Sequence, residues 1–399
     1  MRKQFLIPIA ILLFLAITTA TVSFYGKGYR FSFIEGKPQL SGTGLLVTNS
    51  TPNGAQVFLN GHLTTATDNT INLFPGEYQV RIVKEGYFPW EKKIKVTQEE
   101  VSKVDALLFP SAPQLVSITT TGIENPTIDP SLTRIAYTIA SQSARKNGVY
   151  VLDMSTRPIL TLQSAATQLA DETTDKLSKA FLTWSPDGQE LIASTAGTKA
   201  LYLLQANGFN STPPDITATL TSVQTEWEKL RIEKEKARLT TLTPVLQKLL
   251  SDHFKIISWS PDETKILYQA TSSATLPIII SPRLIGANST PEDRNIRENT
   301  IYVYDSKEDR NYRLDVDPSL RDSNNHHPIH WFPNSTHLIY VHDKRIDAME
   351  YDSMNATTVY AGPFVDSLAF TWPSGSKIVI LTNLGNSNIT PNLYTVDLK

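Results

Sequence analysis

The stretch Leu182-Thr183-Trp184-Ser185-Pro186-Asp187-Gly188-Gln189-Glu190-Leu191-Ile192-Ala193 decides the fold of this chain. Its centre, Ser185-Pro186-Asp187-Gly188, suits a type I turn, because proline fixes the first central dihedral angle and glycine tolerates the exit from the turn. Apolar residues on both sides of this centre indicate two short strands. The stretch therefore predicts a β-hairpin with a tight turn.

The same pattern recurs along the chain after Pro110. A second good copy is Ile257–Tyr268, two looser copies are Ile329–Tyr340 and Phe370–Ile380, and a degenerate copy is Thr127–Tyr137. In most copies a third apolar strand follows, at Gly148–Leu152, Ala200–Leu204, Thr300–Tyr304 and Asn392–Val396. Strand repeats of about 40–50 residues are typical of a β-propeller.

These copies resemble the TolB-like (WD-related) propeller repeat, from Trp-Ser-Pro-Asp-Gly through the Leu-Tyr-Leu strand. The expected fold class is mainly β, with a β-propeller over residues 111–399. Five copies predict five blades, and a diverged sixth blade is the alternative. The last copy has no fourth strand before Lys399, whereas Gln114–Thr119 precedes the first copy without a blade of its own. We therefore expect Gln114–Thr119 to complete the last blade, so that the ring leaves no open edge.

The segment 43–110 also reads as short strands separated by turns. Asn60-Gly61 is a strong hairpin signal, and Tyr78, Val80 and Ile82 alternate with polar residues. The segment resembles the PEGA domain, a small β-sandwich; the matching stretches are Ser50–Gly61, Pro75–Val80 and Lys84–Trp90. The resemblance implies an envelope or surface module without a catalytic role. Tyr87 and Trp90 are expected to close the sandwich core, and a carbohydrate-stacking pair is the alternative.

An apolar run from Phe5 to Phe24 precedes these modules. Twenty helical residues rise about 30 Å, which matches the hydrocarbon core of a bilayer. The alternative is a cleaved secretory signal, which has a shorter apolar stretch and an A-x-A-like site. Ala16 and Ala20 do not have that spacing. We therefore expect a retained transmembrane helix over 5–24.

The flanks of this helix decide its expected orientation. Arg2 and Lys3 favour a cytoplasmic tail over residues 1–4, although Lys27, Arg30 and Lys37 follow the helix. Long domains translocate largely regardless of charge, so the short positive tail decides. The expected order is the tail, the helix, a linker over 25–42 and then both β-modules on the extracytoplasmic side.

Two insertions interrupt the repeats. Residues 221–254 have a helical pattern: Thr221–Gln224 reads as a capping box, Glu226 and Glu228 fall in the first turn, and Thr243-Pro244 begins a second helix. The apolar side chains expected to pack this hairpin on itself or on the propeller are Trp227, Leu230, Val245, Leu246, Leu249 and Leu250. A solvated charged face and a partner-docking hairpin are both compatible with this pattern. The second insertion, Leu276–Asn299, is predicted to be a long loop.

The composition excludes several classes of function. The net charge of −2 gives no cationic field for nucleic acid, and the absence of cysteine excludes disulfides, thiolate catalysis and Cys-ligated metals. The histidines have no established ligand spacing; they are His326, His327, His330, His337 and His342. The acidic residues near them lack the glycine-containing calcium loop; they are Asp305, Asp309, Asp315, Asp317 and Asp322. No hydrolase elbow, P-loop or dinucleotide fingerprint is present. We therefore assign no catalytic, cofactor-binding or metal-ligating residue.

Two functions fit these features. The first is a non-enzymatic, membrane-anchored extracytoplasmic scaffold whose propeller binds a protein or a cell-wall polymer and whose PEGA-like module is a spacer or wall contact. The second is a glycan hydrolase or lyase with a diverged site in the propeller funnel. An enzyme requires convergent titratable groups with perturbed pKa values, whereas a binding protein requires an exposed patch, expected to include the helical hairpin. The sequence leaves the oligomeric state open.

Overall fold

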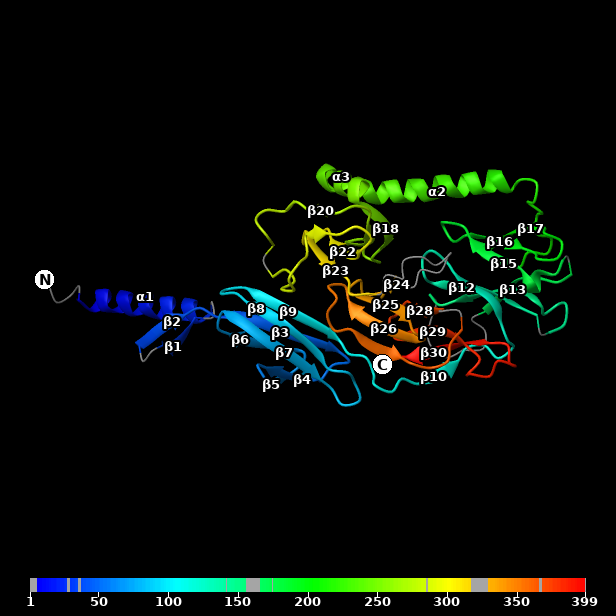
Figure 1. The fold of residues 1–399 in the computed structure, drawn as a ribbon. Helices are drawn as coiled ribbons and strands as arrows, with labels where there is room; N and C mark the ends of the chain where they lie inside the picture. Colours follow the sequence, from blue (N-terminus) through cyan, green and yellow to red (C-terminus); the bar gives the residue numbers. More distant parts are fainter. Residues whose placement is uncertain are drawn as a thin grey trace. The chain divides into compact units, whose positions relative to one another are not determined.

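The computed structural model describes residues 6–26, 29–34, 37–140, 142–155, 166–173, 175–284, 286–316, 329–365 and 368–398. The chain forms two compact units (Figure 1). The first comprises Met1–Phe109 together with Ile280–Pro291, and the second comprises Pro110–Ile279 together with Glu292–Lys399. The first unit therefore contains a piece of chain that the repeats place inside the propeller.

The first unit begins with helix α1 (Leu6–Gly26). Within the described residues, α1 is the one helix long and apolar enough to cross a membrane, and its stretch Pro8–Gly26 is not buried against the rest of the chain. A two-stranded hairpin follows, β1 (Arg30–Ile34) with β2 (Lys37–Ser41). The sequence predicted only a linker over 25–42, because five-residue strands with few turn residues give a weak signal.

Two sheets form the sandwich of the first unit. The larger has the order β5-β4-β7-β8, made of His62–Ala66, Gln56–Leu59, Gly76–Val83 and Trp90–Val96. The smaller has the order β6-β3-β9, made of Asn69–Leu73, Gly44–Thr51 and Val101–Leu107. Buried and exposed residues alternate strictly along β8, as a strand with one covered face requires. The predicted face of β7 is confirmed for Val80 and Ile82, which are fully buried.

The aromatic pair of this module belongs to its core. Trp90 is buried and lies in the cluster of Val57, Val80 and Ile82, and Tyr87 packs against that cluster. The core interpretation of the two aromatics is therefore confirmed: the Trp90 ring is buried, so it cannot stack on a sugar, and the partly buried Tyr87 packs against the same cluster.

Among the described residues, the second unit contains a two-stranded ladder, β20 (Ala274–Thr275) with β21 (Asn295–Ile296), and five antiparallel sheets of three or four strands (Figure 1). The first two are β11–β14 (Glu124–Ile128, Arg134–Ile139, Gly148–Asp153, Ala166–Asp171) and β15–β17 (Phe181–Trp184, Glu190–Ser194, Leu201–Gln205). The third is β18-β19-β22-β23 (Phe254–Trp259, Lys265–Ala270, Ile301–Asp305, Arg310–Arg313). The fourth is β24–β27 (Ile329–Trp331, His337–His342, Arg345–Glu350, Thr357–Tyr360). The fifth is β10-β30-β29-β28 (Leu115–Ser117, Asn392–Asp397, Lys377–Thr382, Ala369–Thr371).

Each predicted repeat supplies two adjacent strands of one of these sheets. The sheets are separate ladders, as propeller blades are. In each sheet the strands follow chain order, except that β20 and β21 interrupt the third sheet and β10 completes the fifth. The blade number of the whole ring stays a prediction.

The closing strand lies where the sequence predicts it. β10 pairs with β30, with Leu115 opposite Val396 and Ser117 opposite Tyr394. Two further backbone hydrogen bonds extend this pairing: Asp397 donates to Gln114, and Ile118 donates to Leu393. The prediction that Gln114–Thr119 completes the last blade is therefore confirmed.

The helical insertion consists of α2 (Leu220–Thr240) and α3 (Pro244–His253). The predicted capping box at Thr221–Gln224 is wrong, because the N-cap is Thr219, two residues earlier than predicted, and its side chain makes no capping bond. As a result Glu226 and Glu228 lie beyond the first turn. The predicted start of the second helix is confirmed: Thr243 caps α3 by accepting a hydrogen bond from Leu246 N, and Pro244 is its first residue.

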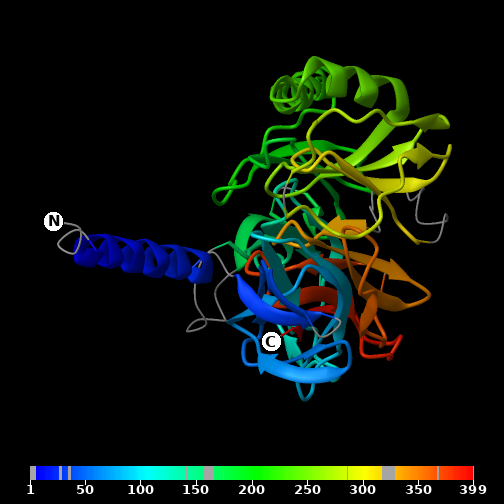
Figure 2. The ribbon, with the colours of Figure 1, turned by 90° about the vertical axis from the view of Figure 1, so that its left-hand side faces the viewer.

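Both helices lie along one side of the sheets of the second unit (Figure 2). Their apolar side chains join clusters with sheet residues, and Leu239 of α2 packs against the same cluster as α3. Trp227 is buried against Ile192 and Ile216, beside the β15–β17 sheet. The predicted core residues of α3 are confirmed, since Leu246, Leu249 and Leu250 join the cluster of the third sheet. Two predicted contacts are wrong, because Leu230 and Val245 are exposed. Helical periodicity placed them on an apolar face, but no sheet side chain covers that part of either helix.

Candidate interaction surface

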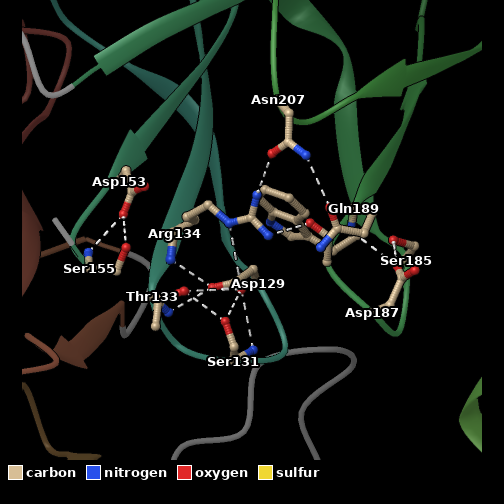
Figure 3. Close-up of polar contacts among 12 residues, drawn as sticks. Asp129, Ser131, Thr133, Arg134, Asp153, Ser155, Ser185, Asp187, Gln189 and Asn207 are labelled. Carbon is tan, nitrogen blue, oxygen red and sulfur yellow. Dashed lines mark hydrogen bonds and ion pairs between the residues drawn. The ribbon is translucent and has the colours of Figure 1, made fainter.

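The aspartates of the repeats serve the turns. In the second sheet, Ser185 Oγ donates to Asp187 Oδ1 at 2.6 Å and accepts Glu190 N at 3.0 Å (Figure 3). Burial by itself would raise the pKa of Asp187, but hydrogen bonds from Ser185 Oγ and Gln189 N outweigh it and hold that pKa below its usual value. Gly188 has a φ of +71°, which explains the glycine at the exit of this turn.

The third sheet repeats this arrangement. Ser260 Oγ donates to Asp262 Oδ1 at 2.6 Å and accepts Lys265 N at 2.9 Å. The pKa of Asp262 is also lowered, since hydrogen bonds from Ser260 and Thr264 outweigh the effect of burial. These carboxylates are therefore committed to local structure rather than directed at a ligand.

The degenerate first repeat uses a different solution. Asp129 stands where the better copies have serine, and its Oδ1 accepts Thr133 N at 2.7 Å and Arg134 N at 2.6 Å (Figure 3). This carboxylate is fully buried, and the Arg134 guanidinium lies 3.9 Å from it. The positive charge of Arg134 thus lies beside the negative charge of Asp129, as burial of a carboxylate requires.

Arg134 connects the first two sheets. Its guanidinium lies over the ring of Trp184 at 5.2 Å from the centroid and donates to the carbonyl oxygen of Gly188. In return, Trp184 Nε1 donates to Thr127 O at 3.3 Å. The tryptophan of the repeat therefore joins neighbouring blades, and it is not a ligand platform.

Helix α2 extends across the turns of the second and third sheets. Near its start, Trp227 Nε1 donates to Glu190 Oε2 at 3.4 Å, and near its end Arg238 Nε pairs with Glu263 Oε1 at 2.8 Å. The positive charge of Lys234 helps to lower the pKa of Asp187, so this part of α2 faces the Ser-Pro-Asp turn of the second sheet. The helix is therefore fixed at both ends.

The side chains in the middle of α2 are exposed. Every residue from Glu228 to Lys234 is exposed, and this stretch includes the apolar side chains Leu230 and Ile232. Arg231 pairs with Glu228 at 2.6 Å and with Glu235 at 3.7 Å, which supports the helix locally. A rigid, charged helix with two exposed aliphatic side chains is suited to contact with a macromolecule. We refer to Glu228–Lys234 as the exposed segment of α2.

The histidines do not converge. His326 and His327 lie outside the described residues. His330 packs edge-on against Phe370, His337 lies beside Asn334, and His342 pairs with Asp347. Within the described ranges, no group of three histidine, aspartate or glutamate side chains is arranged to hold a metal ion.

The acidic residues of the third sheet are similarly dispersed. Asp305 accepts Lys307 N and Glu308 N, and the Asp315 amide donates to Ser353 Oγ. Asp317 and Asp322 lie outside the described residues.

Asp309 has a role that the sequence did not reveal. It is completely buried, and it accepts Tyr304 Oη at 2.7 Å and Ile279 N at 2.7 Å. Arg294 Nη2 pairs with it at 2.9 Å, while Arg294 Nε pairs with Glu292 at 2.9 Å. This network fixes both ends of the long insertion of the third sheet. Ile279 and Arg294 lie 30 and 15 positions from Asp309 in the sequence, so no local spacing pattern could have identified this network.

In the described part of the chain, carboxyl pKa values shift downward and tyrosine pKa values shift upward, both away from pH 7. Hydrogen bonding lowers the pKa of the shifted carboxyl groups, as for Asp187 and Asp262. Tyrosines shift upward instead: burial, assisted by the negative charges of Asp347 and Asp315, raises the pKa of Tyr340 to about 12. Such shifts stabilise one protonation state at neutral pH, which is the opposite of what proton transfer requires.

Comparison with known proteins gives one family assignment. Residues 43–111, which form the sandwich of the first unit, match the PEGA domain. No curated protein matches the chain.

Among solved structures, the chain is similar to a putative TolB from Agrobacterium tumefaciens, with 15% identity over 68% of this chain and 79% of that chain and a TM-score of 0.22. It is also similar to TolB from Acinetobacter baumannii, with 14% identity over 81% of this chain and 60% of that chain and a TM-score of 0.22. A eukaryotic initiation factor aligns with 10% identity over 85% of this chain and 66% of that chain, at a TM-score of 0.21. Two of these structures are TolB proteins. The assignment of a mainly-β propeller fold to this chain is based on the sheets that the chain itself forms.

Proposed function

We propose that this protein is a non-enzymatic binding or scaffold protein of the cell envelope, anchored by α1 with both β-units on the extracytoplasmic side. The observation that carries the proposal is α1 itself: 19 residues, Pro8–Gly26, form an apolar helix with no buried part. An exposed apolar helix of this length is stable in a bilayer and not in water.

The junction between α1 and the PEGA domain supports an anchor rather than a removable leader. Tyr29 N donates to Phe24 O at 3.0 Å, and the two rings pack edge-to-face at 5.2 Å. Tyr29 Oη then donates to Glu99 at 2.7 Å, in the turn between β8 and β9. Because the last turn of the helix is joined to the folded domain, the PEGA domain acts as a membrane-proximal spacer or wall contact.

The propeller is then the platform for a protein or a cell-wall polymer. Its repeat carboxylates are used in turns, and the contact surface best suited to a partner is the exposed segment of α2. Leu230 and Ile232 supply apolar area there, and the surrounding charges give specificity.

Cysteine labelling tests the membrane side, because the natural chain has no cysteine. Leu63→Cys places a thiol on the exposed strand β5, and Gln4→Cys places one before α1. A membrane-impermeant maleimide should label position 63 in intact cells and position 4 only after permeabilisation. Labelling of position 4 alone in intact cells would reverse the proposed orientation.

Affinity capture tests the binding role. The full chain, solubilised in detergent and used as bait on envelope extracts, should enrich a protein or polymer. Ile232→Glu should reduce that enrichment, and Leu384→Glu, a matched change of an exposed apolar side chain in the loop between β29 and β30, should not. Absence of any enriched partner, together with turnover of an envelope glycan, would refute the proposal.

A further inference from the structure

The outer strands of the two PEGA sheets differ in how their edges are protected. Edge strands present unpaired backbone groups, and charged side chains or bulges commonly prevent them from pairing with another chain. β8 carries Lys93 and Lys95 on exposed positions, and β9 carries Lys103 and Asp105. β5 is bulged, since its register with β4 shifts part-way along the strand. These three edges therefore carry a device against pairing.

β6 (Asn69–Leu73) carries none of these devices. Its five residues include no charge and no proline, and it pairs with β3 in an unbroken register. Within the described residues, no strand pairs with its other side. Thr70 and Asn72 are exposed, whereas Ile71 and Leu73 pack against the core of the sandwich. β6 is therefore a regular, uncharged edge that is open to a further strand.

The free backbone groups of this edge belong to Thr70 and Asn72. Leu45 N donates to Glu100 O, just before β9, so the backbone groups of Leu45 face β9. In an antiparallel ladder only alternate pairs exchange hydrogen bonds, so Asn72, the β6 partner of Leu45, directs its amide and carbonyl away from β3, and so does Thr70. In agreement, Thr70 N donates to the side-chain oxygen of Asn69 at 2.8 Å. An amide oxygen thus occupies the position that the carbonyl of a further strand takes.

We propose that β6 pairs with β6 of a second copy of this chain, antiparallel and about a two-fold axis at Ile71. In that register Thr70 lies opposite Asn72 of the second copy, so the free amides and carbonyls of the two edges meet. The smaller sheets of the two copies then join into one sheet of order β9-β3-β6-β6-β3-β9. Such a contact uses the same surface on both copies, as a two-fold interface requires.

The charges around the edge favour a second copy as the occupant. The nearest charged residue, Asp68, lies opposite Phe74 in the proposed register, so no like charges meet. The equivalent two-fold pairing of β8 places Lys93 opposite Lys95, and like charges directly opposite are destabilising. Compatibility of a strand with its own reversed sequence is required for two-fold pairing and for no other occupant.

This inference rests on the proposed membrane anchor. One short strand pair is weak by itself, and copies held in one plane by α1 meet at a higher local concentration than copies free in solution. The pairing is therefore tested with the full chain in liposomes, and flotation with the liposomes reports the anchor separately. A chain that floats without pairing refutes the pairing alone, whereas a chain that does not float refutes the anchor and the pairing that depends on it.

Disulfide cross-linking tests the register, because the natural chain has no cysteine. A mixture of chains carrying Thr70→Cys with chains carrying Asn72→Cys places two thiols directly opposite each other, within reach of a disulfide. Either variant alone places its thiols at diagonal positions, too far apart for an unstrained disulfide. The mixture should therefore give at least about tenfold more cross-linked dimer than either variant alone. Equal yields, or no dimer in any sample, would overturn the proposal, and a strand of another protein on β6 gives the second of these results.

A charge exchange tests the same contact without a cysteine in β6. Leu63→Cys, at an exposed side chain of β5, carries the donor or acceptor dye for energy transfer between copies. Thr70→Lys with Asn72→Lys places lysines opposite each other and should reduce transfer to the level of random mixing, and the matching pair of glutamate changes should do the same. Mixing the lysine chain with the glutamate chain should restore transfer, which a misfolded variant could not do. Transfer that stays high in the lysine chain, or that the mixture does not restore, contradicts pairing through β6.

Discussion

Asn392 is predicted to hold the closing strand of the propeller in place. Its Oδ1 accepts two hydrogen bonds, from Thr119 Oγ1 at 3.0 Å and from Gly122 N at 2.9 Å. Thr119 Oγ1 in turn accepts Leu393 N at 2.9 Å. The side chain therefore links the segment after β10 to the start of β30, which are 270 or more positions apart in sequence.

The magnitude follows from the bonds that Asn392→Ala removes. Each net hydrogen bond contributes about 0.5–1.5 kcal/mol, so the loss of two predicts about 1–3 kcal/mol. Asn392 is only half-buried, so water replaces part of what is lost, and we expect about 2 kcal/mol. This value corresponds to up to about a 30-fold change in the unfolding equilibrium.

Urea unfolding followed by tryptophan fluorescence measures this change. Of the six tryptophans, only Trp90 lies in the PEGA domain, so the signal reports mainly on the propeller. Asn392→Asp keeps the acceptor oxygen and should retain most of the stability. Asn388→Ala, an exposed position in the same loop, is the matched control.

The expected result is a lower urea midpoint for Asn392→Ala with an unchanged slope, because the surface exposed on unfolding stays the same. Limited proteolysis should also cut more readily between residues 110 and 123. If Asn392→Ala shifts the midpoint no more than Asn388→Ala does, closure of the ring does not depend on this side chain and the reasoning is wrong.

Three further predictions concern the first two sheets and α2. Arg134→Ala should reduce the free energy of unfolding by about 2–4 kcal/mol, measured by the same urea unfolding. The change removes a charged hydrogen bond to Gly188 O and leaves the buried Asp129 carboxylate without its nearby positive charge. Arg134→Lys should restore only part of the loss. Trp227→Ala should detach the first half of α2, seen as faster hydrogen exchange over 220–231, while exchange in the sheets is unchanged. The pKa of Asp187 is lowered in the folded chain, so the stability that this carboxylate contributes is present above the unfolded pKa and is lost as pH falls through the folded pKa. Asp187→Asn should therefore flatten the acid side of the curve of unfolding free energy against pH. An unchanged curve would exclude this contribution. Ser185→Ala should flatten it in the same direction, since it removes the bond that lowers that pKa.

The repeats made most of the fold predictable because they act locally. A Ser-Pro-Asp-Gly turn specifies its own hairpin, and the apolar residues around it specify two strands, so Leu182–Ala193 could be placed without knowledge of any partner strand. The pairing of β10 with β30 could be predicted for a related reason. Gln114–Thr119 is an apolar strand without a blade of its own, and the last repeat lacks a fourth strand, so pairing the two covers both open edges.

Helix boundaries and helix contacts were less predictable. Thr221–Gln224 has the composition of a capping box, but the chain already turns into a helix at Leu220, and local sequence cannot distinguish these two starts. Leu230 satisfied the helical period and is still exposed, because burial depends on whether a sheet lies beneath that turn. The start of α2 was therefore misplaced by local sequence, whereas the exposure of Leu230 depends on tertiary contacts that the sequence does not show.

The polar networks could not be predicted at all, and the reason lies in how buried charge is stabilised. A turn needs residue types at adjacent positions, whereas Asp309 needs Arg294, Tyr304 and the amide of Ile279 to arrive from separate parts of the third sheet and its insertion. Nothing in the sequence near Asp309 records that requirement, since any buried cation would satisfy the carboxylate. The same argument explains Arg134, whose sequence neighbours show a degenerate repeat while its contacts lie on Trp184 and Gly188 of the next sheet. In this chain such charged residues lie at the contact between the first two sheets, as Arg134 does, and at the base of the long insertion of the third sheet, as Asp309 and Arg294 do.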